Sequence, residues 1–183
     1  MSRPNIAPIG LPLAPLLLVL AACQPQSSAV PSAVATTPDA EADLVARGEY
    51  LVRVGGCNDC HTPGYAESGG LTPTSEWLQG SPLGHYGPWG TAYPTNLRLT
   101  IDKLSEQDWL TYSATLRTRP LMPDFTLRNM SEADRRAIYR FIRSLGPAGV
   151  PAPQALPPGQ LPPPPYLALV LPEPPAGAAA QAP

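Results

Sequence analysis

The sequence predicts an all-α domain of short helices and long loops, with proline-rich segments before and after it. Charged and aromatic residues concentrate in the middle of the 183-residue chain, whereas 13 of its 27 prolines lie between Pro147 and Pro183. Three stretches of the middle carry helix signals, and strand signals are few. We therefore expect one compact domain over residues 41–148. The net charge of about −2 indicates no nucleic-acid-binding surface.

The three predicted helices are recognised by their ends and by the spacing of their apolar residues. Residues 39–56 begin with acidic side chains, which suit a helix N-terminus, and end in two glycines, which suit a helix C-terminus. Ser105 can cap a short helix within residues 104–118, and Ser131 can cap the clearest helix, within residues 130–147. Apolar residues of this last helix follow the spacing i, i+3, i+4 and i+7: Ile138, Phe141, Ile142 and Leu145.

The stretch between the first two predicted helices, residues 62–100, is rich in glycine, proline and aromatic residues and shows no periodicity. A solvated linker does not need so many large rings, because each ring gains free energy by burial. These rings are Trp77, Tyr86, Trp89 and Tyr93. We therefore expect a long loop that is packed against another part of the domain.

The first 22 residues indicate a targeting segment. Arg3 precedes an apolar run that is interrupted by prolines and is too short to span a bilayer comfortably. The run ends in Leu-Ala-Ala-Cys at residues 20–23, which resembles a bacterial lipoprotein signal, in which the cysteine (here Cys23) becomes the lipid-modified first residue. An ordinary signal peptide, or a buried helix with an incidental cysteine, is the alternative.

Two further segments flank the domain. Residues 23–40 are small, polar and dotted with proline, so they cannot bury enough apolar surface to order themselves. We expect them to form a flexible tether. Residues 149–183 form a proline-rich C-terminal extension, which we expect to be extended or polyproline II.

The stretch Cys57-Asn-Asp-Cys60-His61 has three readings. A zinc site would need further ligands at a second spaced pair. A thioredoxin-like dithiol would need a strand before it and a helix after it, whereas this motif follows a predicted helix and precedes Thr-Pro-Gly. The third reading is haem attachment, because two cysteines at this spacing bind the vinyl groups of haem while the adjacent histidine binds the iron. We favour the third.

A haem iron bound by His61 needs a sixth ligand or has an open position. Met122 lies between two prolines that restrict the backbone, in a loop ahead of the last helix, and we expect it to be that ligand. Met130 immediately precedes the N-cap of the last helix, so packing is its expected role. His85, or an open position, is the remaining alternative.

Together these features resemble the class I c-type cytochromes with one haem, over about residues 43–148. The resemblance implies a cytochrome c fold, with short helices and long loops wrapped around one covalently attached haem c. It implies thioether bonds at Cys57 and Cys60, with His61 as proximal and Met122 as distal ligand of the iron.

Two further points depend on the same resemblance. In that family a glycine of the first helix meets an aromatic residue of the last helix, and the matching positions here are Gly48 and Tyr139. Residues 62–121 are longer and richer in glycine than in the short mitochondrial-type members.

The resemblance implies an electron carrier rather than an enzyme, because an iron with both axial positions filled does not bind substrate easily. We expect redox protein partners, which are a dehydrogenase, an oxidase or a quinol-oxidising complex. The expected location is the periplasmic side of the bacterial cell envelope, on the inner or outer membrane through a lipid anchor. One alternative is a haem-based redox or gas sensor with a displaceable or absent sixth ligand. A haem enzyme that uses His85 as acid or base is another.

Overall fold

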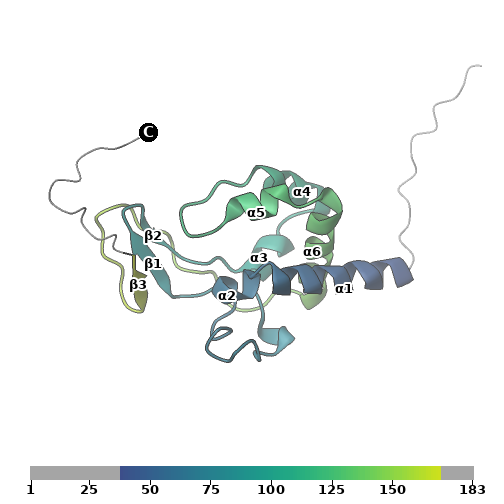
Figure 1. Cartoon of the computed structure of the whole chain (residues 1–183), viewed down its shortest axis with the longest axis horizontal. Coiled ribbons are helices and arrows are strands. Elements are labelled where there is room, and N and C mark those ends of the chain that lie inside the picture. The colour runs from purple at the N-terminus through teal and green to yellow at the C-terminus, as the bar shows by residue number, and fades with distance from the viewer. Residues whose placement is uncertain (1–37, 170–183) are drawn as a thin grey trace, which may run out of the picture. The chain divides into compact units, whose positions relative to one another are not determined.

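The computed structural model describes residues 38–169 (Figure 1). The predicted signal peptide, Cys23, most of the tether and residues 170–183 lie outside this range. The described elements, in chain order, are α1 (Pro38–Val54), α2 (Cys57–His61), a 3₁₀ turn (Thr74–Glu76), β1 (Gly84–Gly87), β2 (Gly90–Ala92), α3 (Leu97–Asp102), α4 (Glu106–Thr115), α5 (Asp124–Asn129), α6 (Glu132–Leu145) and β3 (Tyr166–Ala168). Within the described range, each helix falls short of the length and apolar character that a membrane span requires.

The mostly helical architecture confirms the predicted fold class. Helices α4 and α6 lie inside two of the predicted helical stretches, and α1 matches the first stretch but begins one residue earlier, at Pro38. Ser105 and Ser131 cap α4 and α6 as expected, since each hydroxyl accepts a hydrogen bond from the backbone N–H three residues later at 3.1 Å. Three helices were not predicted, and each has six residues or fewer, which is too short for a periodic apolar pattern to emerge.

A small three-stranded sheet is an addition to the predicted all-α fold (Figure 1). β1 lies in the middle, antiparallel to β2 and parallel to β3. The strands β1 and β2 come from the stretch that was expected to be a loop, and their three or four residues contain three glycines, so they show neither alternation nor β-branched runs. Gly90 begins β2 with φ +93°, a conformation that other residues rarely adopt.

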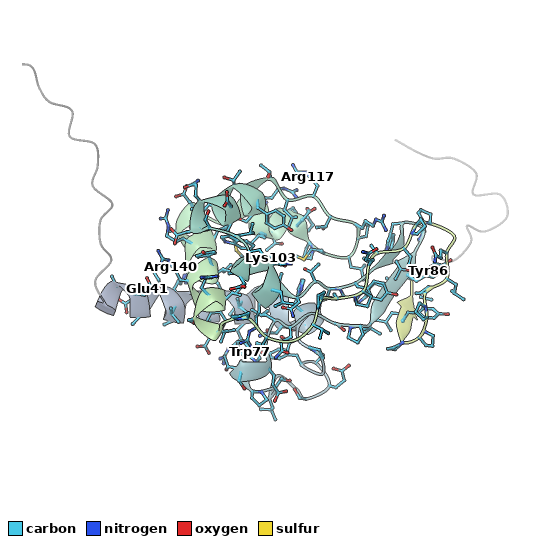
Figure 2. The ribbon with its side chains drawn as sticks, turned by 180° about the vertical axis from the view of Figure 1, so that it is seen from behind. Glu41, Trp77, Tyr86, Lys103, Arg117 and Arg140 are labelled. Atoms are coloured by element: carbon cyan, nitrogen blue, oxygen red, sulfur yellow. The ribbon has the colours of Figure 1, made fainter. Side chains whose placement is uncertain are left out.

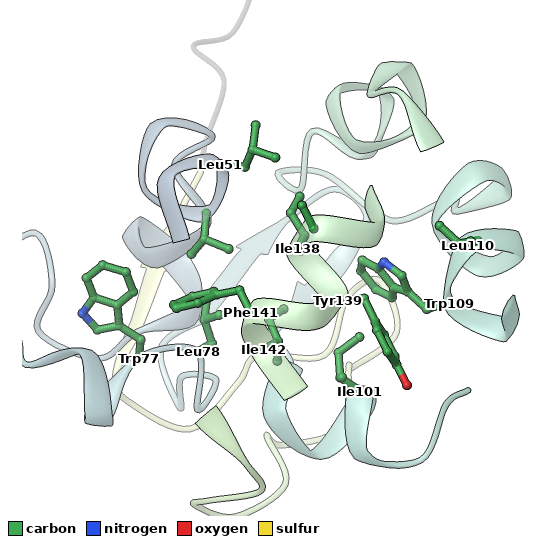
Figure 3. Packing of buried hydrophobic residues seen from close by; sticks show 12 residues of the cluster. Leu51, Trp77, Leu78, Ile101, Trp109, Leu110, Ile138, Tyr139, Phe141 and Ile142 are labelled. Carbon is green, nitrogen blue, oxygen red and sulfur yellow. The ribbon is translucent and has the colours of Figure 1, made fainter. Parts of the chain in front are cut away.

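The helices α1 and α6 cross in close contact at Gly48. A Cβ atom at this position would lie 2.0 Å from the Ala137 carbonyl oxygen and 2.6 Å from Phe141 Cβ. Glycine is therefore required for the approach of the two helices. The aromatic residue that meets it is Phe141, so the expected pairing with Tyr139 is wrong. Tyr139 lies on another side of α6, near Trp109 (Figure 3), and donates a hydrogen bond to the Leu104 carbonyl at 3.0 Å.

The core surrounds α6 (Figure 3). Trp77, from the long stretch between α2 and β1, is buried and packs edge-on against Phe141 at a centroid distance of 6.2 Å. Trp109 of α4 is buried on another side of α6, where its indole N–H donates to the Arg135 carbonyl at 2.8 Å. Aromatic rings from the long loop and from α4 therefore enlarge the core around α6, which would be small without them. The buried apolar residues are Leu51, Val52, Trp77, Leu78, Ile101, Trp109, Leu110, Ala137, Ile138, Tyr139, Phe141 and Ile142.

Two kinds of polar contact hold α6 in place. At its C-terminal end, the buried Arg98 of α3 donates to the Gly146 carbonyl at 2.5 Å, to the Leu145 carbonyl, and to the Ser75 carbonyl at 2.7 Å. This guanidinium therefore satisfies carbonyls that the helix end leaves unpaired. On the outer face, Arg140 lies 3.5 Å from Glu41 of α1 (Figure 2) and 2.6 Å from Glu106 of α4.

Residues 149–169, the described part of the predicted extension, are attached to the domain. The Asn96 amide donates to the Ala148 carbonyl at 2.8 Å and to the Val150 carbonyl at 3.1 Å. Thr91 and Leu156 form an isolated antiparallel bridge, and β3 then pairs with β1. The extension therefore runs from the end of α6 to the sheet and becomes its third strand.

Gly48→Ala tests the helix crossing. The added methyl group has no space between α1 and α6, so the free energy of unfolding should fall by about 1–3 kcal/mol, measured by urea or thermal denaturation. The control is Ala46→Gly at an exposed position of α1, which should cost about 1 kcal/mol through helix propensity alone. A higher unfolding midpoint for Gly48→Ala would contradict the close crossing.

Candidate functional site

The Cys-x-x-Cys-His motif forms the one-turn helix α2, directly after α1. Gly55 donates its N–H to the Leu51 carbonyl at 2.8 Å and so completes the last turn of α1. Gly56 then adopts φ +68°, a left-handed conformation that reverses the chain direction and begins α2. The two glycines therefore place the motif against the end of α1, and the position of α1 is set by its crossing with α6.

Cys57 and Cys60 lie three residues apart on α2, so their side chains are neighbours on the helix surface. Both thiols are unpaired; Cys57 is partly buried and Cys60 is exposed. Burial raises the pKa of the Cys57 thiol to about 11, and burial also raises the pKa of the Cys60 thiol. Reactive dithiols instead show lowered thiol pKa values, so these cysteines lack that property. Within residues 38–169, no group of three or more His, Cys, Asp or Glu side chains is placed so that it could hold a metal ion.

His61 ends α2 and is buried. Its ring Nδ1 lies 2.7 Å from the Thr95 carbonyl oxygen, which can only accept, so Nδ1 carries the proton. Burial lowers the pKa of the imidazole and therefore favours its neutral form. A neutral histidine with a protonated, hydrogen-bonded Nδ1 presents Nε2 as its metal-binding atom.

The backbone of His61 is fixed as well. Its carbonyl accepts the Gly80 N–H at 2.8 Å. Gly80 has φ +79°, and a Cβ atom there would lie 2.7 Å from the Asn96 backbone nitrogen. The stretch after the motif therefore returns past His61, and the segment that carries Thr95 packs directly against it.

A buried polar network supports the motif and was missed by the sequence reasoning. Asn58, between the two cysteines, is fully buried, and its side-chain oxygen accepts the Thr62 hydroxyl at 2.8 Å. The same hydroxyl accepts the Leu78 N–H at 2.8 Å. Nothing in the local sequence distinguishes Asn58 from any other residue between two cysteines, so only the packing shows its role.

Met122 lies in the loop between α4 and α5, residues 116–123, with 37% of its surface exposed. Its carbonyl accepts the Asp124 N–H at 2.8 Å and the Thr118 hydroxyl at 3.3 Å. The backbone around Met122 is therefore held by its own loop, while the thioether side chain is not enclosed by it.

Asp124 is the residue around which this loop closes. It is buried, its carboxylate accepts the Thr118 N–H at 2.6 Å, and it forms an ion pair with Arg128 one turn along α5. Arg128 also donates to the Leu116 carbonyl at 2.8 Å. The hydrogen bond from Thr118, followed by those from Arg128, holds the pKa of the Asp124 carboxyl below its usual value. An acidic residue in the first turn of a helix is an ordinary signal, so the sequence reasoning did not single it out.

The other candidate ligands have different surroundings. Met130 packs against the core, and its methyl group lies 3.7 Å from the place where a Cβ of Gly55 would be. This contact is the helix-entry packing that was expected for Met130. His85 lies in β1, opposite Ala92 of β2, and its carbonyl accepts the Trp89 indole N–H at 3.3 Å.

The residues fit the haem that the sequence predicts. Two unpaired thiols stand next to a neutral, oriented histidine, which is the donor set required for thioether attachment and proximal iron ligation. Exposed apolar side chains lie in the loop of Met122 and at the start of α5. They are Leu121 and Met122 in the loop and Phe125 in α5.

Comparison with known proteins supports the same class. The chain is 31% identical over 139 residues to the cytochrome c subunit of a quinone alcohol dehydrogenase from Gluconacetobacter polyoxogenes, and equally to that from Komagataeibacter europaeus. The matched region is 66% of this chain and 26% of each relative, so the chain spans about a quarter of the relatives' length. No family model matches the chain, and no solved structure matches it. The similarity and the motif geometry together support a c-type cytochrome with a cytochrome c-like fold.

Asp124→Asn tests the closure of the Met122 loop. Because the folded-state pKa of this carboxyl lies below its usual 3.8, the ionised group stabilises the fold fully above that pH, and this effect is lost as the pH falls from there through the lowered folded-state pKa. The variant should have a lower melting temperature at pH 7 and a smaller loss of stability between pH 7 and about pH 2, measured by circular dichroism.

The matched control is Asp102→Asn, since Asp102 forms an exposed ion pair with Arg143 at 3.3 Å. Exposed pairs of this kind contribute little, so its melting temperature should stay close to that of the unmodified protein. Equal behaviour of the two variants would argue against a special role for Asp124.

Proposed function

We propose that this chain is a class I c-type cytochrome that carries single electrons through one covalently bound haem. The observation that carries the proposal is the arrangement of α2, where two free thiols adjoin His61 and the Thr95 carbonyl fixes the tautomer of its ring. When bound, haem supplies reversible one-electron transfer at its iron. An electron carrier needs this one-electron chemistry and does not need a substrate-binding pocket. The chain that we propose is therefore a carrier and not itself an enzyme.

The residues have distinct roles in this proposal. Cys57 and Cys60 bind haem through thioether bonds, and His61 Nε2 is the proximal ligand. Met122 supplies its thioether sulfur as the distal ligand, which would make the potential higher than two histidine ligands would. The Thr95 carbonyl and the Gly80 N–H hold His61 in one orientation, so that ligation needs little rearrangement when the iron changes its charge.

A dehydrogenase is the electron donor that we favour. The matched relatives are cytochrome c subunits of a quinone alcohol dehydrogenase, and this similarity supports a related enzyme as partner. An oxidase or a quinol-oxidising complex would then be the electron acceptor.

The place of action that we propose is the periplasmic face of a bacterial membrane. Support comes from the sequence around Cys23, which resembles a bacterial lipoprotein signal. A lipid anchor on Cys23 and the tether of residues 23–40 would keep the domain close to membrane-bound partners and so raise their effective concentration.

A haem-based gas or redox sensor is the second candidate, and one observation favours it. Met122 lies in the loop between α4 and α5 rather than in a helix. A weakly held ligand could leave the iron when a gas binds. The two functions differ in one measurement, because prompt carbon monoxide binding to the ferrous protein at neutral pH indicates a sensor.

Removal of the thioether anchors is the direct test of haem attachment. Cys57→Ala combined with Cys60→Ala should abolish covalent haem, because no sulfur remains to bind the vinyl groups. The measurement is haem staining after denaturing electrophoresis of protein made in a host that matures c-type cytochromes. A haem-stained band from the double variant would contradict the proposed attachment.

The distal ligand is tested by a pair of methionine variants. Met122→Ala should abolish the weak near-infrared absorbance that an iron–sulfur bond gives the ferric protein. Met130→Ala should keep this absorbance and lower thermal stability instead, because Met130 packs against the core. Loss of the absorbance in Met130→Ala and its retention in Met122→Ala would reassign the ligand.

A further inference from the structure

We propose that Arg119 is a positioning residue that ties the loop of Met122 to the proline-rich extension through the carbonyl of Leu156. The inference rests on the proposed function, in which Met122 is the distal ligand of the iron. It adds a role for the extension, which becomes a strap that restrains the ligand loop, and it concerns residues outside the haem-attachment motif.

The extension, which we call the strap, is hydrogen-bonded to β2 at Leu156, the residue that Arg119 contacts. Leu156 and Thr91 exchange both backbone hydrogen bonds, each at 3.0 Å, which joins the extension to β2. Gly90 allows this approach, since a Cβ atom there would lie 2.2 Å from the Leu156 carbonyl oxygen. A residue with a side chain at position 90 would therefore push the strap away from the sheet.

Arg119 reaches this anchored point from the ligand loop. Its guanidinium Nη1 donates to the Leu156 carbonyl oxygen at 2.8 Å, across 37 residues of sequence. The acceptor is the same oxygen that receives the Thr91 N–H, so the loop, the strap and β2 meet at one atom. A charged donor makes this hydrogen bond stronger than one between two neutral groups.

Arg117 shows that this contact is specific to one of two nearby arginines. Arg117 lies two residues earlier, in the first part of the loop after α4 (Figure 2), and donates to the Leu116 carbonyl at 2.9 Å and the Thr115 carbonyl at 3.4 Å. Both acceptors belong to its own segment, so Arg117 makes no such contact with the strap. The two residues have the same charge and similar exposure, and Arg117 is therefore the matched control.

The tie acts next to the point where the loop is closed. The Asp124 carboxylate accepts the Thr118 N–H and so joins the two ends of residues 118–124, and Arg119 directly follows Thr118. Arg119 is separated from Met122 by two residues, and Pro120 limits the backbone between them because its φ is fixed. A hydrogen bond that fixes Arg119 therefore also limits the positions that Met122 can adopt.

The consequence is a lower population of the form in which the sixth position is open. An external ligand binds that form alone, so its apparent dissociation constant varies inversely with the open fraction. Loss of one net hydrogen bond of this kind should raise the open fraction about fivefold. Arg119→Ala should therefore bind carbon monoxide in the ferrous state with an apparent dissociation constant about fivefold lower, whereas Arg117→Ala should match the unmodified protein.

The experiment compares the full-length holoprotein with Arg119→Ala, Arg119→Lys, Arg117→Ala and Met122→Ala. Carbon monoxide titration and the near-infrared absorbance report on the iron, and hydrogen exchange of peptides over residues 116–123 and 150–160 reports on the tie without using the iron. Arg119→Ala should speed exchange in both segments. Arg119→Lys should restore much of the protection, since an ammonium group can also donate to one carbonyl oxygen.

Two outcomes overturn different statements. In the first outcome, Arg119→Ala matches Arg117→Ala in hydrogen exchange and in carbon monoxide affinity, while Met122→Ala loses the near-infrared absorbance. The proposed role of Arg119 is then wrong, and the proposal that Met122 is the distal ligand is kept. If Met122→Ala keeps the absorbance, the proposed ligand is wrong, and the exchange data then decide separately whether Arg119 restrains the loop.

Discussion

The crossing of α1 and α6 at Gly48 is the contact on which the rest of the structure depends. It brings the backbone of α6 within reach of α1, and Trp77, Trp109 and α3 then pack around α6. Because only Gly55 and Gly56 separate α1 from α2, the same crossing sets where the Cys-x-x-Cys-His motif lies. A core of about a dozen buried apolar residues is small for a domain of this length, and a bound cofactor would add to it.

The two sides of the candidate site are built differently. His61 is buried, its ring is oriented by a carbonyl, and its backbone is bonded to Gly80. Met122 instead belongs to a surface loop that is closed from within by Asp124 and from outside by Arg119. A carrier needs both ligands to stay in place in both oxidation states, so the restraints on the Met122 loop matter more than those on His61. The choice between an electron carrier and a sensor therefore depends on this loop.

The C-terminal extension has a structural role that its composition hides. Proline-rich segments lack backbone donors and form few regular contacts. Here Leu156 and the strand β3 supply the necessary hydrogen bonds, and the glycines of β1 and β2 let the extension approach closely. The extension thereby links the end of α6, the sheet and the loop of Met122.

The sequence alone determined the helices α1, α4 and α6 and their caps, because these depend on spacing and on neighbouring residues. The prediction that Cys57, Cys60 and His61 act as a set also came from the sequence, since it depends on local spacing. The sheet, the pairing of Gly48 with Phe141 and the contacts of Thr95, Asn58, Asp124 and Arg119 were decided by tertiary structure alone. Each joins residues far apart in sequence or depends on burial, and short strands with glycine leave no periodic signal.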